Sequence, residues 1–184
     1  TQPSDYAALS YGSPIKAAET VVAFETNGYA VVRVTNTEGL VTYKEIEVSA
    51  QVMGVGEDFF RVKAFNFAQG KTFTSLDIKT QAQSIIIDNN TLKKLFPKDN
   101  PIGKVVFVGK VPLKVTGILE EKKSGFSNSE NLQVFIPYTT AMHRLLGVKN
   151  LGSITIRVKD GIDTQIAENG IIALLTRSHG GKKD

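Results

Sequence analysis

The chain has 184 residues, of which 41% are hydrophobic and 22% charged, and it contains no cysteine. This is the composition of a globular domain able to bury a core, and it excludes thiol catalysis, cysteine metal sites and disulfides. The formal net charge of +4 is uneven, because residues 93–123 hold eight lysines against three acidic residues and so carry +5. No apolar run approaches the roughly 18 residues that a membrane-spanning helix needs.

The first third of the chain predicts a short helix followed by strands. Ser4 is a typical N-cap residue and predicts a helix that ends at Leu9. Asn27-Gly28 suits the left-handed dihedrals of a tight turn and predicts a hairpin. Another turn is expected at residues 36–39, and residues 42–55 then read as one long strand.

The middle of the chain predicts short helices and strands in alternation. A helix over residues 57–64 would bury Phe59, Phe60 and Val62. Residues 84–87 form a brief buried strand, followed by a helix that Asn89 or Asn90 caps. A hairpin is then expected, with one strand over residues 104–108 and its return over residues 111–119.

The stretch KLFPKDNPIGKVVFV, residues 94–108, joins this helix to the hairpin. Pro97 ends the helix, because the residue before a proline avoids the helical region. Asn100, Pro101 and Gly103 form the turn that follows. Each of these residues has a backbone role, so the stretch is predicted to be a corner between a helix and a strand.

The last third predicts a polar loop, two strands and two helices. The loop covers residues 122–131, and the strands cover residues 132–136 and 153–159. A helix capped by Thr139 or Thr140 lies between the strands, and a longer helix follows over residues 163–179. The pattern as a whole predicts an α+β fold. Because a helix on a sheet usually leads back into that sheet, both ends are expected to be cut edges of a larger protein.

Residues Gly70-Lys71-Thr72 copy the end of a phosphate-binding loop. That motif needs a second glycine five positions earlier, where this chain has Phe65. His143 and His179 lack the spacing of a metal site. The sequence therefore predicts no enzyme, no cofactor and no metal site in this chain, and no binding or hydrolysis of ATP.

The basic middle of the chain could attract nucleic acid, an anionic membrane or an acidic protein, or its lysines could protect exposed strand edges. Single-strand nucleic acid binders interleave basic residues with exposed aromatic rings. Phe96 and Phe107 are predicted to be buried, and there is no tryptophan. Nucleic acid is therefore not expected as a partner.

Several stretches resemble the periplasmic core domain of MacB-type ABC transporters, the macrolide and toxin exporters of Gram-negative bacteria. They are VMGVGEDFFRVKAFNFAQGKTFT (52–74), IIIDNNTLKKLFPKDNPIGKVVFV (85–108), VTGILEEKKSGF (115–126), VFIPYTTAMHRL (134–145) and SITIRVKDG (153–161). Their order and spacing cover about two-thirds of the chain, while residues 1–50 match mainly in their strand-rich character.

The resemblance implies a fold of two lobes. A porter-like mixed α/β lobe is built from both chain ends, residues 1–50 and 134–184. A mostly β lobe of the type called Sabre is inserted between them, residues 51–133.

The resemblance also implies a function. The chain would be a non-catalytic periplasmic domain of a dimeric inner-membrane permease that carries its ATP-binding domain in the cytoplasm. It would dock a MacA-type periplasmic adaptor, work indirectly with a TolC-type outer-membrane channel, and gate or transmit motion for efflux, as in macrolide resistance.

Two alternatives remain open. Lipoprotein-releasing and FtsX-type permeases share the architecture, and an extracytoplasmic ligand-binding module would use a cleft between the lobes. The residues predicted to dock the adaptor lie on the polar loop: Phe126 as an apolar anchor, and Lys122 and Lys123 to steer the approach.

Overall fold

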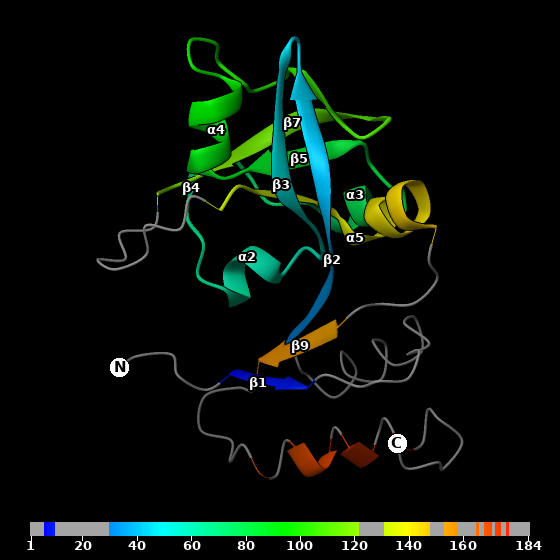
Figure 1. Ribbon diagram of the computed structural model, residues 1–184. Helices are drawn as coiled ribbons and strands as arrows, with labels where there is room; N and C mark the ends of the chain where they lie inside the picture. The colour runs from blue at the N-terminus through cyan, green and yellow to red at the C-terminus, as the bar shows by residue number, and fades with distance from the viewer. Residues whose placement is uncertain are drawn as a thin grey trace.

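The computed structural model describes residues 6–9, 30–121, 131–147 and 153–157, and some positions between 165 and 176. In this part of the chain nine strands belong to one sheet (Figure 1). They are β1 (Tyr6–Leu9), β2 (Ala30–Tyr43), β3 (Ile46–Val55), β4 (Phe67–Gly70), β5 (Ser84–Ile87), β6 (Val105–Val108), β7 (Val111–Leu119), β8 (Gln133–Pro137) and β9 (Ser153–Arg157). The helices are α2 (Phe59–Val62), α3 (Ser75–Lys79), α4 (Asn89–Leu95), α5 (Tyr138–Thr140) and the π-helical η1 (Ala141–Leu146). The predicted α+β fold is confirmed in its coarse form, a chain that combines helices with a dominant sheet.

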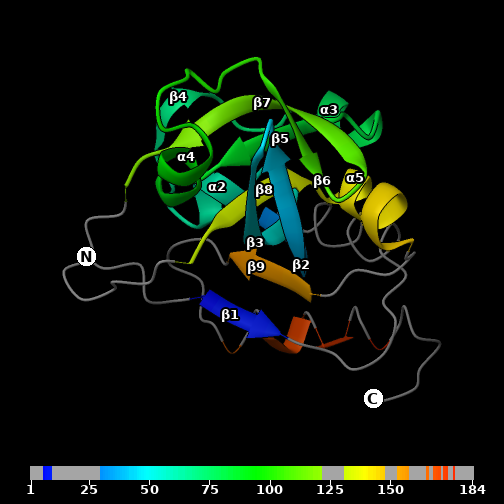
Figure 2. The same cartoon turned by 45° about the horizontal axis from the view of Figure 1, so that its top comes forward.

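Six of these strands close into a small barrel. The hydrogen-bonded order is β1-β9-β2-β3-β8-β5-β7-β4, and β6 pairs with both β2 and β7. A ring therefore forms from six strands in the order β2, β3, β8, β5, β7 and β6 (Figure 2). The pairing of β6 with β2 closes it. Closure of a sheet removes exposed strand edges, and here it also creates an interior.

The barrel interior holds the larger core cluster of the described residues. Alternate residues of each strand point inward, so the run Ile85-Ile86-Ile87 sends its first and third side chains into this cluster. Leu95 and Phe96, from α4 and the residue after it, pack into the same cluster. The ring of Phe96 lies 4.2 Å from that of Tyr43 on β2.

A second cluster, rich in phenylalanine, packs against the outside of β5 and β8. Ile86 and Phe135, which point away from the barrel interior, meet Phe59 and Phe60 of α2 there. The rings of Phe60 and Phe135 are 5.3 Å apart in an edge-to-face arrangement. Both faces of β5 and β8 are thus buried, which explains the apolar runs at residues 85–87 and 134–137.

Strand β2 joins this barrel to a separate group of strands. Its residues 30–34 pair with β9, which pairs in turn with β1, and its residues 34–43 pair with β3. Figure 1 shows β1 and β9 at one end of the long β2–β3 pair. Both lobe boundaries expected from the resemblance fall inside continuous strands, β3 and β8. The division into residues 1–50 and 134–184 against residues 51–133 stays a prediction.

Several elements differ from those expected. Residues 6–9 form a strand rather than a helix, and the turn expected at residues 36–39 is part of β2. The chain turns instead at Lys44, whose φ of 53° is in the left-handed region. Gly39 serves close packing, since a Cβ there would lie 3.1 Å from a methyl group of Val52.

Other elements agree with the sequence. The strands over residues 84–87 and 111–119 have the predicted bounds, and α2 buries Phe59, Phe60 and Val62. The cap of α4 is Asp88 rather than Asn89 or Asn90, because its side chain accepts a 2.8 Å hydrogen bond from the Thr91 amide. The Asn27-Gly28 hairpin and most of the loop over residues 122–131 lie outside the described residues, while the described positions between 165 and 176 are helical.

The corner after α4 anchors the turn between β2 and β3. Asp99 accepts a 2.7 Å hydrogen bond from Lys44 Nζ and one of 3.2 Å from the Tyr43 hydroxyl. These hydrogen bonds lower the pKa of Asp99, and the same contact raises the pKa of Lys44. The prediction that this stretch is a structural corner agrees with these contacts.

Replacing Gly70 with alanine should strongly destabilise the fold. Gly70 has a φ of 79°, and an added Cβ would collide with the carbonyl oxygen of Thr116 and lie 2.6 Å from Gly117 Cα. Backbone strain and this collision together should cost more than about 2 kcal/mol. Urea unfolding measures it, with Gly109→Ala as the control, because Gly109 has a φ of 58° but open space around it. Equal losses in the two variants would contradict the packing role of Gly70.

Replacing Asp88 with asparagine should change how stability depends on pH. Burial raises the pKa of Asp88, and this outweighs the hydrogen bonds from Thr91. The contribution of this carboxyl to stability is therefore greatest below its unfolded pKa, about 3.9, and is lost as pH rises through the folded pKa. Asparagine can cap the helix without a charge, so the melting temperature of Asp88→Asn should rise relative to wild type between pH 4 and neutrality.

The matched control is Asp99→Asn, for which the sign is opposite. The pKa of Asp99 is lowered, so its contribution is present above its unfolded pKa and is lost as pH falls through the folded pKa. Asp99→Asn should therefore be less stable than wild type at neutral pH and approach it in acid. A constant difference between wild type and Asp88→Asn over the whole pH range would contradict the role assigned to burial.

Candidate functional site

The residues predicted to dock an adaptor, Lys122, Lys123 and Phe126, lie outside the described residues. The other sequence features that pointed to a site are described. They are the Gly70-Lys71-Thr72 motif, the basic residues between 93 and 121, and Phe96 and Phe107.

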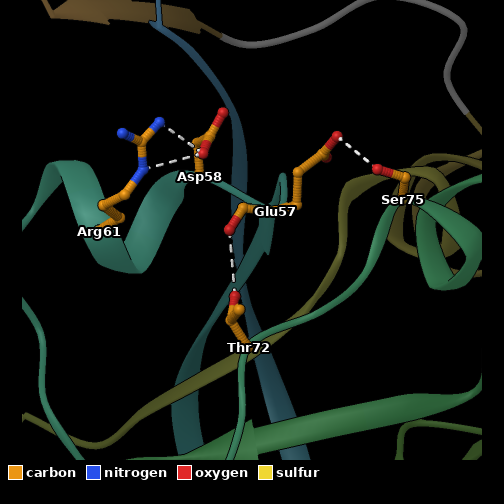
Figure 3. A network of polar contacts seen from close by, with 5 residues as sticks. All are labelled: Glu57, Asp58, Arg61, Thr72 and Ser75. Atoms are coloured by element: carbon orange, nitrogen blue, oxygen red, sulfur yellow. Dashed lines mark hydrogen bonds and ion pairs between the residues drawn. The ribbon is translucent and has the colours of Figure 1, made fainter.

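The Gly70-Lys71-Thr72 motif lies at the end of β4, beside the corner that links β3 to α2 (Figure 3). The Thr72 hydroxyl donates a 3.1 Å hydrogen bond to the Glu57 carbonyl oxygen. The Ser75 hydroxyl donates one of 3.4 Å to the Glu57 carboxylate. In a phosphate-binding loop the hydroxyl after the lysine holds Mg²⁺, whereas here it ties two segments of the chain together.

The helix that follows the motif, α3, is short and already capped. It has five residues, and Thr74 and Asp77 form a reciprocal capping box at its start. Nearby, Arg61 and Asp58 form an ion pair of 2.7 Å on α2. The polar contacts at this corner therefore fasten β3, α2 and α3 to one another.

The lysines of the basic middle lie in different places. Lys93 on α4 forms an exposed ion pair of 3.0 Å with Glu121 after β7. Lys104, Lys110 and Lys114 are exposed on or beside the β6–β7 hairpin. An exposed ion pair such as that of Lys93 contributes little stability, and the other three lysines give the β6–β7 hairpin a basic surface.

The two phenylalanines of the basic middle have different surroundings. Phe96 is buried as predicted, at 4% exposure, but the prediction that Phe107 is buried is wrong, since 46% of it is exposed. Strand β6 alternates, with Val106 and Val108 inside the barrel and Val105 and Phe107 outside. All four residues are apolar, so the sequence does not indicate which pair faces the interior.

One open pocket lies between the β2–β3 pair and α4. Its volume is about 300 Å³, at the lower end of the range for small-molecule sites. The lining is mostly polar: Glu38, Ser49, Ala50, Gln51, Lys94, Asn131 and Leu132.

The described part of the chain holds no group of three or more histidine, cysteine, aspartate or glutamate side chains that could bind a metal ion. Within the same ranges, no helix combines the length and the apolar character needed to cross a membrane. His143 is exposed on η1, and His179 lies outside the described residues.

Comparison with known proteins gives consistent results. Residues 1–174 match the family described as the MacB-like periplasmic core domain. The macrolide export ATP-binding/permease protein MacB 2 of Yersinia pestis bv. Antiqua is 45% identical over 153 residues, which are 83% of this chain and 23% of that protein. The MacB protein of Chromobacterium violaceum is 42% identical over 164 residues, which are 88% of this chain and 25% of that protein. The chain thus spans about a quarter of the length of these relatives.

Solved structures share the fold. The periplasmic region of MacB from Actinobacillus actinomycetemcomitans matches with a TM-score of 0.80 at 25% identity, covering 95% of this chain and 77% of that one. The extracellular domain of the ABC-type transporter YknZ from Gram-positive bacteria matches with a TM-score of 0.77 at 22% identity, covering 94% and 88%. The family match over nearly the whole length and the shared fold lead to one conclusion: the chain belongs to the family of MacB-like periplasmic core domains.

Proposed function

We propose that this chain is the non-catalytic periplasmic domain of a MacB-type ABC exporter, which docks a periplasmic adaptor and transmits motion for efflux. The observation that carries the proposal is the family match over residues 1–174, together with relatives named as macrolide export ATP-binding/permease proteins. In this proposal the domain belongs to a dimeric inner-membrane permease. Its partners are a MacA-type adaptor and, indirectly, a TolC-type channel.

The chain itself binds no cofactor in this proposal, and ATP acts in a cytoplasmic domain of the parent protein. The contacts of Thr72 with Glu57 support this, because the motif that resembles a phosphate-binding loop has a structural use. Two strands would be shared by the porter-like lobe, residues 1–50 and 134–184, and the Sabre-like lobe, residues 51–133. Strand β3 crosses one boundary between the lobes and β8 crosses the other.

The transmission of motion is supported by the course of β2. One strand of 14 residues pairs at one end with β9 and at the other with β3 and β6. A displacement of β9 would therefore reach the barrel through continuous backbone and its hydrogen bonds rather than through a loop.

A ligand-binding module is the second candidate function, and the 300 Å³ pocket beside α4 favours it. This pocket lacks the apolar lining that is usual for a small-molecule site. Saturable binding of an amphiphile that Lys94→Ala abolishes would favour this candidate over adaptor docking.

The test of the proposed function is a titration of the chain with the MacA-type adaptor of the same bacterium. We expect saturable binding that Phe126→Ala weakens by about 10-fold or more, since truncation of an anchor residue typically costs at least 2 kcal/mol. Lys122→Glu combined with Lys123→Glu should slow association and reduce its salt dependence.

Leu76→Ala is the control for Phe126→Ala, because Leu76 on α3 is also apolar and is 67% exposed. It should leave the affinity unchanged. Failure of the wild-type chain to bind the adaptor would contradict the proposed function. Wild-type binding that is unchanged in the loop variants would leave the function standing and remove the loop from the docking surface.

A further inference from the structure

An apolar surface lies on the outside of the barrel over β2, β6 and β7, and we call it the β6 surface. It is formed by Leu40, Val105, Phe107 and Pro112. The first three are 50%, 47% and 46% exposed. Phe107 is paired with Pro112 on β7 and with Thr42 on β2, so these residues share one face of the sheet.

The backbone holds the β6 surface in a fixed shape. The Gly109 amide donates a 2.9 Å hydrogen bond to the Leu40 carbonyl oxygen, which brings Leu40 next to the β6–β7 turn. Directly beneath the surface, Val106 and Val108 are buried in the barrel core. The outward side chains therefore cannot turn inward without breaking the ring, because a one-residue slip would expose the core valines.

The charges that β6 and β7 place around the β6 surface are positive. Residues 100–119 hold three lysines, Lys104, Lys110 and Lys114, and no acidic residue. Lys114 is the cross-strand neighbour of Val105, and Lys110 lies in the turn. Two acids lie on the other side of the surface: Glu38 is exposed on β2 two residues before Leu40, and Glu47 on β3 accepts a 3.3 Å hydrogen bond from Thr42. The ion pairs of the described residues join Lys44 to Asp99, Arg61 to Asp58 and Lys93 to Glu121, and so involve neither Lys110 nor Lys114.

We propose that the β6 surface docks an acidic surface of a partner protein, with an apolar side chain of the partner packed against Val105 and Phe107. This inference rests on the proposed function, in which the partner surface belongs to the periplasmic adaptor. The exposed aromatic ring, the apolar neighbours and the basic rim match the usual anatomy of an interface, an apolar centre within a charged border. The lysines specify the charge of the partner as negative.

Charge argues against a second copy of this chain as the occupant. The formal net charge of +4 makes two copies repel, and the β6 surface itself has more lysines than acids beside it. The pocket beside α4 differs from this surface in charge, because its lining includes both an acid, Glu38, and a lysine, Lys94.

The test uses the full chain and the MacA-type adaptor of the same bacterium. Val105→Thr combined with Phe107→Thr removes the apolar centre and places a β-branched residue suited to a strand at both positions. We expect this variant to bind the adaptor at least about 10-fold more weakly, with its melting temperature retained. Its control is Leu76→Ala, which removes an exposed apolar side chain on α3 and should bind like wild type.

A second pair of variants tests the charge. Lys110→Glu with Lys114→Glu should slow association and reduce its salt dependence, whereas the same change in net charge through Lys71→Glu with Lys79→Glu should affect both much less. Lys71 and Lys79 are exposed on the loop before α3 and at the end of that helix.

The outcomes separate the inference from the function on which it rests. Wild-type binding that is unaffected by the Val105 and Phe107 changes overturns the inference and leaves the proposed function intact. Absence of wild-type binding overturns both. Two further results assign the surface to another occupant and overturn the inference: self-association of wild type that these changes abolish, or binding to phosphatidylglycerol vesicles that they abolish.

Discussion

The pairing of β6 with β2 is the constraint on which the rest of the structure depends. It consists of a short register, Val41 with Val108 and Thr42 with Phe107, extended by the hydrogen bond from the Gly109 amide to Leu40. Without it the sheet would be open, and the inward side chains of β2 and β7 would lose their neighbours across the ring. With it, alternate residues of six strands enclose one core.

Closure also determines what remains outside. Once Val106 and Val108 occupy the interior, the pleat places Val105 and Phe107 in solvent. On the opposite side of the ring, the outward residues Ile86 and Phe135 are covered by α2 and its phenylalanines. The two outer faces thus differ: one is covered by the chain's own helix, and the other carries apolar side chains beside lysines. This difference is the structural basis for placing a partner on the β6 surface.

The sequence predicted local elements well and long-range pairing poorly. Strand β5 could be delimited by its apolar run and β7 by the turn residues Gly109 and Lys110 before it, and α2 could be placed because its phenylalanines cluster. The course of β2 could not be predicted, because a glycine such as Gly39 is typical of a turn. In the structure Gly39 lies within the strand and leaves room for Val52. The exposure of Phe107 could not be predicted either, since it follows from the pairing of β6 with a strand far away in the sequence. The family resemblance identified the periplasmic core domain, which the family match confirms, while its division into two lobes stays a prediction.

Amide hydrogen exchange at Gly109 tests the closure of the ring most directly. Its amide bonds to Leu40 across the β2–β6 seam, while the Gln51 amide bonds to Leu132 beside the β3–β8 pair. If the ring is closed, Gly109 should exchange only when the barrel opens, at a rate comparable to that of Gln51. Exchange at Gly109 as fast as that of an exposed turn amide, with Gln51 still protected, would show that β6 does not close the barrel and would contradict the account.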